Sequence, residues 1–132
     1  MAKVPSSLAE SRRAASLWHS FGYALAGIRY VLLTQRNAQV HIGVAVVVVG
    51  LGLLLRISAT QWAILAITIG LVIAVEMLNT ALEATIDLVS PDYHPLAKIA
   101  KDAAAGAVLV LALAAVGVGI AIFGPPLWLM TG

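Results

Sequence analysis

The sequence predicts an all-α integral membrane protein, with an N-terminal amphipathic helix on the membrane surface followed by three transmembrane helices. Hydrophobic residues make up 61% of the 132 residues and charged residues 11%, against about half and about a quarter in an average soluble domain. Three uncharged stretches, at 37–55, 57–75 and 103–132, approach or exceed the roughly 20 residues that cross a bilayer. We expect one membrane domain over 1–132, with spans at about 37–56, 60–88 and 96–123.

Residues 7–33 form a different kind of segment, in which basic residues interrupt an apolar pattern of helical spacing. The apolar positions of that pattern are Leu17, Phe21, Leu25, Ile28 and Leu32. Ser7 and Glu10 have the spacing of a capping box. A basic amphipathic helix of this kind lies in the membrane interface rather than crossing it. The pattern does not decide whether this helix is only an anchor or also lines a site.

The connections between the expected spans are short. Ser58 and Gln61 have capping-box spacing for the helix at 60–88. Pro91 ends that helix, and Pro95 suits the first turn of the next one.

The basic residues predict the orientation of the chain. Seven of the eight Lys and Arg residues lie before the first span or around the second connection, and only Arg56 lies in the turn between the first two spans. By the positive-inside rule, the N-terminus and the 88–98 loop are cytoplasmic. Trp62 and Trp128 then fall at the outer boundary, where we expect an aromatic belt.

Polar residues gather on one stripe of the second span. Glu76, Asn79, Glu83 and Asp87 are spaced by three, four and four residues, which places them on one helix face. Glu76 lies about 24 Å along the helix from Thr60, near the inner edge of the hydrocarbon. A carboxylate well inside a bilayer costs about 2.5–3.5 kcal/mol, so this stripe must face protein, water or a cation. Its oxygen ligands suit Mg²⁺; the alternative is a set of hydrogen bonds and salt bridges that hold an oligomer together.

A basic cluster opens the third span. Lys98, Lys101 and Asp102 stand at its start, where lysine charge and the helix N-terminus both favour phosphate. With the acidic stripe, this cluster predicts a site for Mg²⁺-bound phosphates at the cytoplasmic membrane face. The alternative for the lysines is positive-inside anchoring alone. The sequence contains no Walker loop and no kinase glycine loop.

The motifs "ExxNTALExxxD" and "YHPLAKxAKDxAAGAV" resemble the prokaryotic diacylglycerol kinase family, including its undecaprenol kinase branch. The resemblance runs from about residue 20 to about residue 119. It implies a lipid kinase of the bacterial inner (cytoplasmic) membrane that uses ATP and Mg²⁺. It also implies a homotrimer in which neighbouring chains share each active site, and the small residues at 103–107 would permit such close helix approach. No nucleic-acid partner is expected.

The resemblance also implies roles for individual residues. Glu76 corresponds to the general base that accepts the lipid hydroxyl proton, Asn79 to the residue that orients substrate or base, and Glu83 to a metal ligand. The positions implied near the nucleotide are Tyr23, Asp87, Asp92, Tyr93, His94, Lys101 and Asp102.

One stretch departs from the family pattern. "TQRNAQVH" at 34–41 resembles "TExNFRIH", so Gln35 stands where a second metal-binding glutamate is often found. An amide there would hold the cation, and with it the nucleotide, more weakly or through water. Ala38 and Gln39 replace an aromatic residue and an arginine, whereas Asn37 and His41 are retained as candidate substrate contacts.

The predicted reaction is direct phosphoryl transfer from ATP to a membrane lipid alcohol, either diacylglycerol to phosphatidic acid or undecaprenol to undecaprenyl phosphate. The loop motif looks closer to the undecaprenol kinase branch, but the sequence does not choose the lipid. One alternative is a small oligomeric ion or proton conductor, although the polar stripe does not continue through 57–75. The other alternative is a non-enzymatic assembly or anchor subunit.

Overall fold

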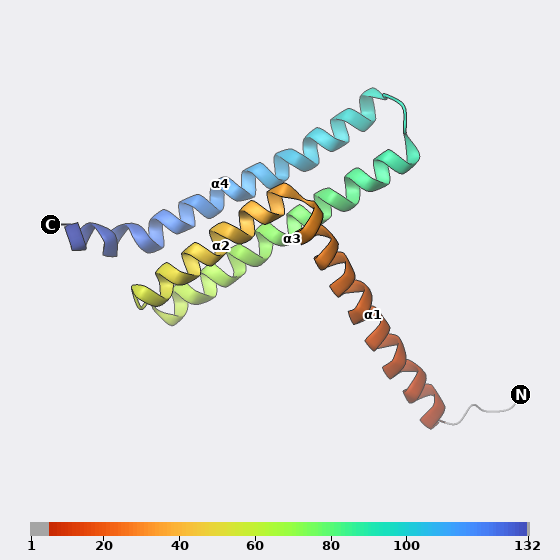
Figure 1. Cartoon of the computed structure of the whole chain (residues 1–132), viewed down its shortest axis with the longest axis horizontal. Helices are drawn as coiled ribbons and strands as arrows, with labels where there is room; N and C mark the ends of the chain where they lie inside the picture. Colours follow the sequence, from red (N-terminus) through yellow and green to blue (C-terminus); the bar gives the residue numbers. More distant parts are fainter. Residues whose placement is uncertain (1–5, 132) are drawn as a thin grey trace, which may run out of the picture.

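The computed structural model describes the backbone of residues 6–131 and the side chains of residues 16–129. The described chain is helical almost throughout, with α1 at Ser6–Thr34, α2 at Arg36–Leu54, α3 at Ala59–Val89 and α4 at Pro95–Thr131. Helices α2, α3 and α4 run side by side, whereas α1 projects away from them at a steep angle (Figure 1). The side chains of Ser7 and Glu10, and with them the expected capping box, lie outside the described residues.

Three of these helices are suited to a bilayer. α2, α3 and the Pro95–Leu129 part of α4 are each long and apolar enough to cross a membrane, and most of their large hydrophobic side chains are exposed. Exposed apolar side chains are expected where lipid rather than water surrounds a helix. The predicted all-α fold with three apolar spans is confirmed.

The turn between α2 and α3 is fixed by side-chain caps. Ser58 is the N-cap of α3: its Oγ accepts a hydrogen bond from the Gln61 backbone N–H at 3.3 Å, and Gln61 Oε1 accepts one from the Ser58 N–H at 2.9 Å. This is the capping box predicted from the sequence. Arg56, in the same turn, has a left-handed φ of 51°.

Helix α4 is longer than the sequence predicts. It was expected to end near residue 123, but it continues through Pro125 and Pro126 to Thr131. The φ that a proline ring imposes is close to the helical value, so prolines can follow a helical path if the helix absorbs two missing N–H donors. The helix axis bends near this end (Figure 1). Smaller differences are that α2 begins at residue 36 and ends at residue 54, rather than at 37 and 56.

The apolar core lies at the end of the bundle that carries the α2–α3 turn. Leu65, Ile122 and Phe123 are buried there, and Trp62 packs against them. A Cβ on Gly52 would lie 2.9 Å from Trp62 Cη2, so the ring sits directly on the α2 backbone. Trp62 is therefore half-buried against the core at the start of α3, and its expected place at the outer membrane boundary stays a prediction. Polar residues occupy the opposite end of the bundle.

Candidate functional site

The first residues of the polar stripe on α3 are buried against the neighbouring helices. Glu76 is only 2% exposed, and Asn79 and Thr80 are each 8% exposed. The helix presents them on the same face as the buried Leu65 and Val72, which is the face against which the neighbouring helices pack. A carboxyl group is thus held among packed helices near the end of an apolar span.

The hydrogen bonds of this stripe are incomplete. Asn79 Nδ2 donates to Glu83 Oε1 at 3.1 Å, and the Thr80 hydroxyl donates to the Glu76 carbonyl oxygen at 3.0 Å. Among the described residues, Glu76 Oε2 and Asn79 Oδ1 are the buried side-chain atoms that have no hydrogen-bond partner. Buried polar atoms are normally paired, so each unpaired one calls for an explanation. Both unpaired atoms belong to residues on adjacent turns of one helix face.

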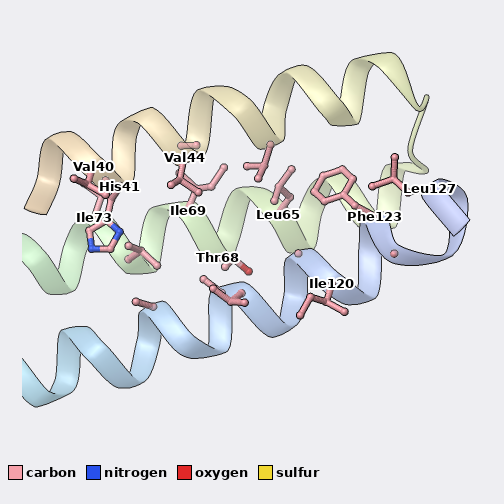
Figure 2. A pocket seen from close by; sticks show the side chains of 18 residues that line it. Val40, His41, Val44, Leu65, Thr68, Ile69, Ile73, Ile120, Phe123 and Leu127 are labelled. Carbon is pink, nitrogen blue, oxygen red and sulfur yellow. The ribbon is translucent and has the colours of Figure 1, made fainter.

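His41 of α2 is an ionisable neighbour of Glu76 from another helix. It lies within electrostatic range of Glu76, as does Glu83 one turn further on. His41 also lines the end of an apolar cavity of about 610 Å³ that runs between α2, α3 and α4. Figure 2 shows His41 and Ile73 at one end of this cavity and Phe123 and Leu127 at the other. The acid of the stripe therefore stands beside one end of an apolar cavity.

The basic cluster of α4 joins the same face of the protein. Lys101 forms an ion pair with Asp87, which follows Glu83 by one turn on α3. Lys98 pairs with Asp102 within α4. The structure thus brings the acidic stripe and the start of α4 together, as the sequence predicts.

The connection between α3 and α4 is exposed and locally ordered. His94 Nδ1 accepts a hydrogen bond from the Leu96 N–H at 3.2 Å, which caps the first turn of α4. The Ser90 hydroxyl donates to the carbonyl of Asp92 at 3.1 Å. Tyr93 is 80% exposed. A hollow of about 480 Å³ lies beside this connection, lined by Thr85, Ile86, Val89, Ser90, His94, Leu96 and Ala97.

Three predicted site residues lie apart from the stripe in this single chain. Tyr23 is 76% exposed on α1, and among the described helices α1 packs on α2 and α3 but not on α4. Gln35 is the N-cap of α2 and makes no capping bond; its Nε2 donates to Thr34 Oγ1 at 3.3 Å. Asn37 is exposed near the start of α2. Among the described residues, no hydrogen bond or ion pair links any of the three to α3.

Sequence reasoning missed two features of the site. Thr80 is buried directly beside Glu76, and only its position within "NTALE" could have drawn attention to it. The apolar cavity was also missed, because its lining residues have the same composition as the lipid-facing ones.

The oxygen donors of the stripe fit a hard cation only in combination with further ligands. Among the described residues, no three His, Asp or Glu side chains group closely enough to hold a metal ion. Magnesium in phosphate-binding sites is commonly held by one or two carboxylates together with substrate phosphates and water. Glu83, with the unpaired Asn79 Oδ1 beside it, meets this lower requirement.

Comparison with known proteins matches residues 22–123 to the model of the family described as prokaryotic diacylglycerol kinase. The match covers most of the chain, including all of the polar stripe and the start of α4. The chain belongs to the prokaryotic diacylglycerol kinase family. The resemblance inferred from the two motifs is confirmed.

Three relatives illustrate the range of this family. The chain is 49% identical over 115 residues to a diacylglycerol kinase of Synechocystis, and the matched region covers 86% of the chain and 66% of that relative. It is 45% identical over 108 residues to the undecaprenol kinase of Bacillus subtilis, covering 82% of the chain and 88% of the relative. A diacylglycerol kinase of Pseudomonas aeruginosa is 36% identical over 89 residues, covering 67% of the chain and 72% of the relative.

Membership of the prokaryotic diacylglycerol kinase family bears on the predicted activity. The names of the relatives support a lipid kinase, which is a phosphotransferase with an alcohol acceptor, and a kinase family implies a nucleotide substrate. They do not favour the alternative of an ion or proton conductor. The three apolar helices agree with a membrane protein.

Proposed function

We propose that this chain transfers the γ-phosphoryl group of ATP to the hydroxyl of a membrane lipid alcohol, with Glu76 as general base. The observation that carries the proposal is the buried Glu76 carboxyl, whose Oε2 has no hydrogen-bond partner. A carboxyl group inside an apolar span is costly, and such residues usually mark a functional site. A lipid hydroxyl is a ligand of matching depth that donates one hydrogen bond.

The proposed step balances without any further reactant. The lipid hydroxyl donates its proton to Glu76 Oε2 while its oxygen forms a bond to the γ-phosphorus. The bond between that phosphorus and the β–γ bridging oxygen breaks, and ADP leaves. Such transfers depend on positioning and charge neutralisation more than on covalent chemistry by the protein.

The neighbouring residues take positioning roles in this proposal. Asn79 is held by its bond to Glu83 Oε1, and its buried Oδ1 has no partner. Lys101, positioned by Asp87, offers its charge to phosphate oxygens. Glu83 and Asn79 would hold Mg²⁺ with the nucleotide, and Gln35 would assist only through an uncharged amide. When bound, Mg²⁺ supplies neutralisation of the phosphate charge.

The adenosine end of ATP belongs, in this proposal, at the α3–α4 connection. The hollow of about 480 Å³ beside Ser90 and His94 adjoins the Asp87–Lys101 pair in sequence, and Asp92, Tyr93 and Asp102 flank it. This position agrees with the loop role that the family resemblance implies.

We also propose that the site is completed in a homotrimer of the bacterial inner membrane, with the N-terminus cytoplasmic. Support comes from α1, which carries Tyr23 away from α4 of its own chain (Figure 1). A neighbouring chain could supply the missing α1 contact. Mass spectrometry of the complex released from detergent tests the trimer directly, because any other stoichiometry would contradict it.

The activity is tested with detergent-solubilised protein, γ-labelled ATP and either undecaprenol or a diacylglycerol. Labelled phospholipid is the expected product. Glu76→Gln keeps the shape but removes the base and should lower kcat by about 10²–10⁴-fold, whereas Glu76→Asp retains an acid and should keep part of the activity. Thermal unfolding in detergent checks that each variant folds. Normal turnover by folded Glu76→Gln would exclude the role of base.

A further inference from the structure

The apolar cavity between α2, α3 and α4 carries information about the lipid that the sequence does not. The cavity has a volume of about 610 Å³, and His41 and Thr68 are the polar residues among the described residues that line it. The Thr68 hydroxyl already donates to the Ile64 carbonyl at 2.8 Å. The cavity therefore offers a hydrocarbon surface along its whole length and a polar group, His41, at one end.

The polar end of the cavity lies next to the proposed site. His41 and Ile73 lie together at one end of the cavity (Figure 2). Ile73 precedes Glu76 by one turn of α3, and His41 lies within electrostatic range of Glu76. A lipid whose hydroxyl reaches Glu76 would thus enter the cavity with the carbons that follow the hydroxyl.

The cavity extends past the middle of the membrane. If hydrocarbon begins near Thr60 and is about 30 Å thick, its midplane falls near Gly70 at 1.5 Å per residue. On α3 the lining runs from Ile73 to Leu65, which is on both sides of Gly70. On α4 it runs from Ala112 to Leu127, a rise of about 22 Å.

The apolar lining and the length of the cavity both distinguish a polyprenol from a diacylglycerol. Each acyl chain of a diacylglycerol occupies about 15 Å, which is one leaflet, and its two ester groups lie next to the hydroxyl. The described lining near Glu76 offers His41 as the single donor for those esters, and a buried carbonyl without a donor is unfavourable. A polyprenol is hydrocarbon up to the carbon that bears the hydroxyl, and its one long chain can pass the midplane.

We propose that this cavity binds the chain of a polyprenol, and that the enzyme prefers a long single-chain isoprenoid alcohol to a diacylglycerol. The inference rests on the proposed kinase activity. It names the substrate class for that same site.

Two glycines of α4 give a matched pair of variants. Gly119 lines the cavity and Gly117 does not. Gly117 is exposed, and a Cβ at either position would meet no atom within 4 Å. Leucine at Gly119 therefore extends into the cavity about halfway along its α4 wall, whereas leucine at Gly117 extends away from it. Both changes raise helix propensity equally.

The experiment compares kcat/KM for undecaprenol, geraniol and dioleoylglycerol in the same detergent micelles. The wild-type protein should prefer undecaprenol to dioleoylglycerol by at least tenfold. Gly119→Leu should lower the ratio of undecaprenol to geraniol turnover about tenfold, because the short alcohol does not reach the blocked part. Gly117→Leu should leave that ratio unchanged, and thermal unfolding checks that both variants are folded.

Two results would overturn the inference while leaving the kinase intact. One is a preference for dioleoylglycerol. The other is an unchanged undecaprenol-to-geraniol ratio in Gly119→Leu, which would mean that a bulk lipid or a neighbouring subunit fills the cavity. If the wild-type protein phosphorylated none of these alcohols, the result would contradict the proposed kinase function itself.

Discussion

Lys101 of α4 and Asp87 of α3 form an ion pair across 14 residues of chain. Among the described residues it is the one ion pair that joins two helices, since Lys98 and Asp102 pair within α4. The pair fixes the start of α4 against the last turns of the acidic stripe. The two charged halves of the proposed nucleotide site are thereby held in one place.

Replacing Lys101 separates the binding role of this pair from its structural role. The Lys101 and Asp87 side chains are 37% and 65% exposed, so the pair contributes at most about 1 kcal/mol to stability. Lys101→Met should therefore unfold at nearly the wild-type temperature. Its KM for ATP should rise about tenfold, because a charge-assisted bond to phosphate is lost.

Lys98→Met is the control for this prediction. Lys98 is 59% exposed and its partner lies on its own helix, so its removal should raise KM for ATP less. Equal effects of the two variants would mean that overall positive charge, rather than the position of Lys101, governs nucleotide binding.

Gln35→Glu should reduce the Mg²⁺ concentration required for half-maximal activity. The change places a carboxylate, a stronger ligand for a hard cation than an amide, where the family commonly has glutamate. The variant should fold normally, since Gln35 makes no capping bond at the start of α2. A magnesium titration of kcat at fixed ATP measures the effect.

Gln39→Glu provides the matched charge change at the same helix junction. Gln39 Nε2 donates to the Leu33 carbonyl at 3.2 Å, so it is already engaged with the backbone of α1. Its substitution should not lower the magnesium requirement. A similar shift in both variants would indicate a general charge effect and would contradict a ligand role for position 35.

Gly52→Ala should destabilise the protein. The new Cβ would lie 2.9 Å from Trp62 Cη2 and 3.1 Å from Ile57 Cδ1, and overpacking of this kind costs about 1–3 kcal/mol. Gly50→Ala, with no atom within 4 Å of its Cβ, should be neutral or slightly stabilising. Thermal unfolding in detergent measures both.

A double variant tests whether the contact with Trp62 causes the loss of stability in Gly52→Ala. Trp62→Phe removes the ring atoms that approach Gly52, so Gly52→Ala should cost less in the Trp62→Phe background than alone. Additive effects of the two substitutions would show that the loss at position 52 arises from something other than this contact.

Ser58→Ala should cost about 0.5–2 kcal/mol, the usual value of an N-cap. Its Oγ accepts a hydrogen bond from the Gln61 N–H, and the helix offers that N–H no other acceptor. Thr60→Ala, two residues later and exposed, is the control and should change the unfolding temperature little. No loss of stability in Ser58→Ala would mean that water satisfies the helix end equally well.

Much of the fold could be predicted because membrane helices are specified locally. The uncharged runs define the spans, and Ser58 with Gln61 defines a helix start. The stripe from Glu76 to Asp87 was predictable for the same reason, since helical spacing alone places these residues on one face. Nothing in the sequence shows that Asn79 bonds to Glu83 and leaves Glu76 Oε2 open, because those details depend on rotamers and on packing.

The end of α4 and the surroundings of Trp62 could not be predicted by local rules. Proline is normally a helix terminator, yet Pro125 and Pro126 lie within α4 because the helix bends instead of ending. The sequence places Trp62 near the outer boundary, but it does not show whether its ring faces lipid or packs on Gly52 of the facing helix. That choice depends on a contact between two helices, which neither segment reveals by itself.

The two prolines give α4 an uneven stiffness. Because Pro125 and Pro126 donate no backbone hydrogen bond, the turn before them is held by fewer bonds than any other part of the helix. Bending is therefore least costly there, next to Phe123 and Leu127 at the far mouth of the cavity. A change in the direction of the last turns of α4 would therefore alter the shape of that end of the cavity more readily than the shape of the Glu76 end.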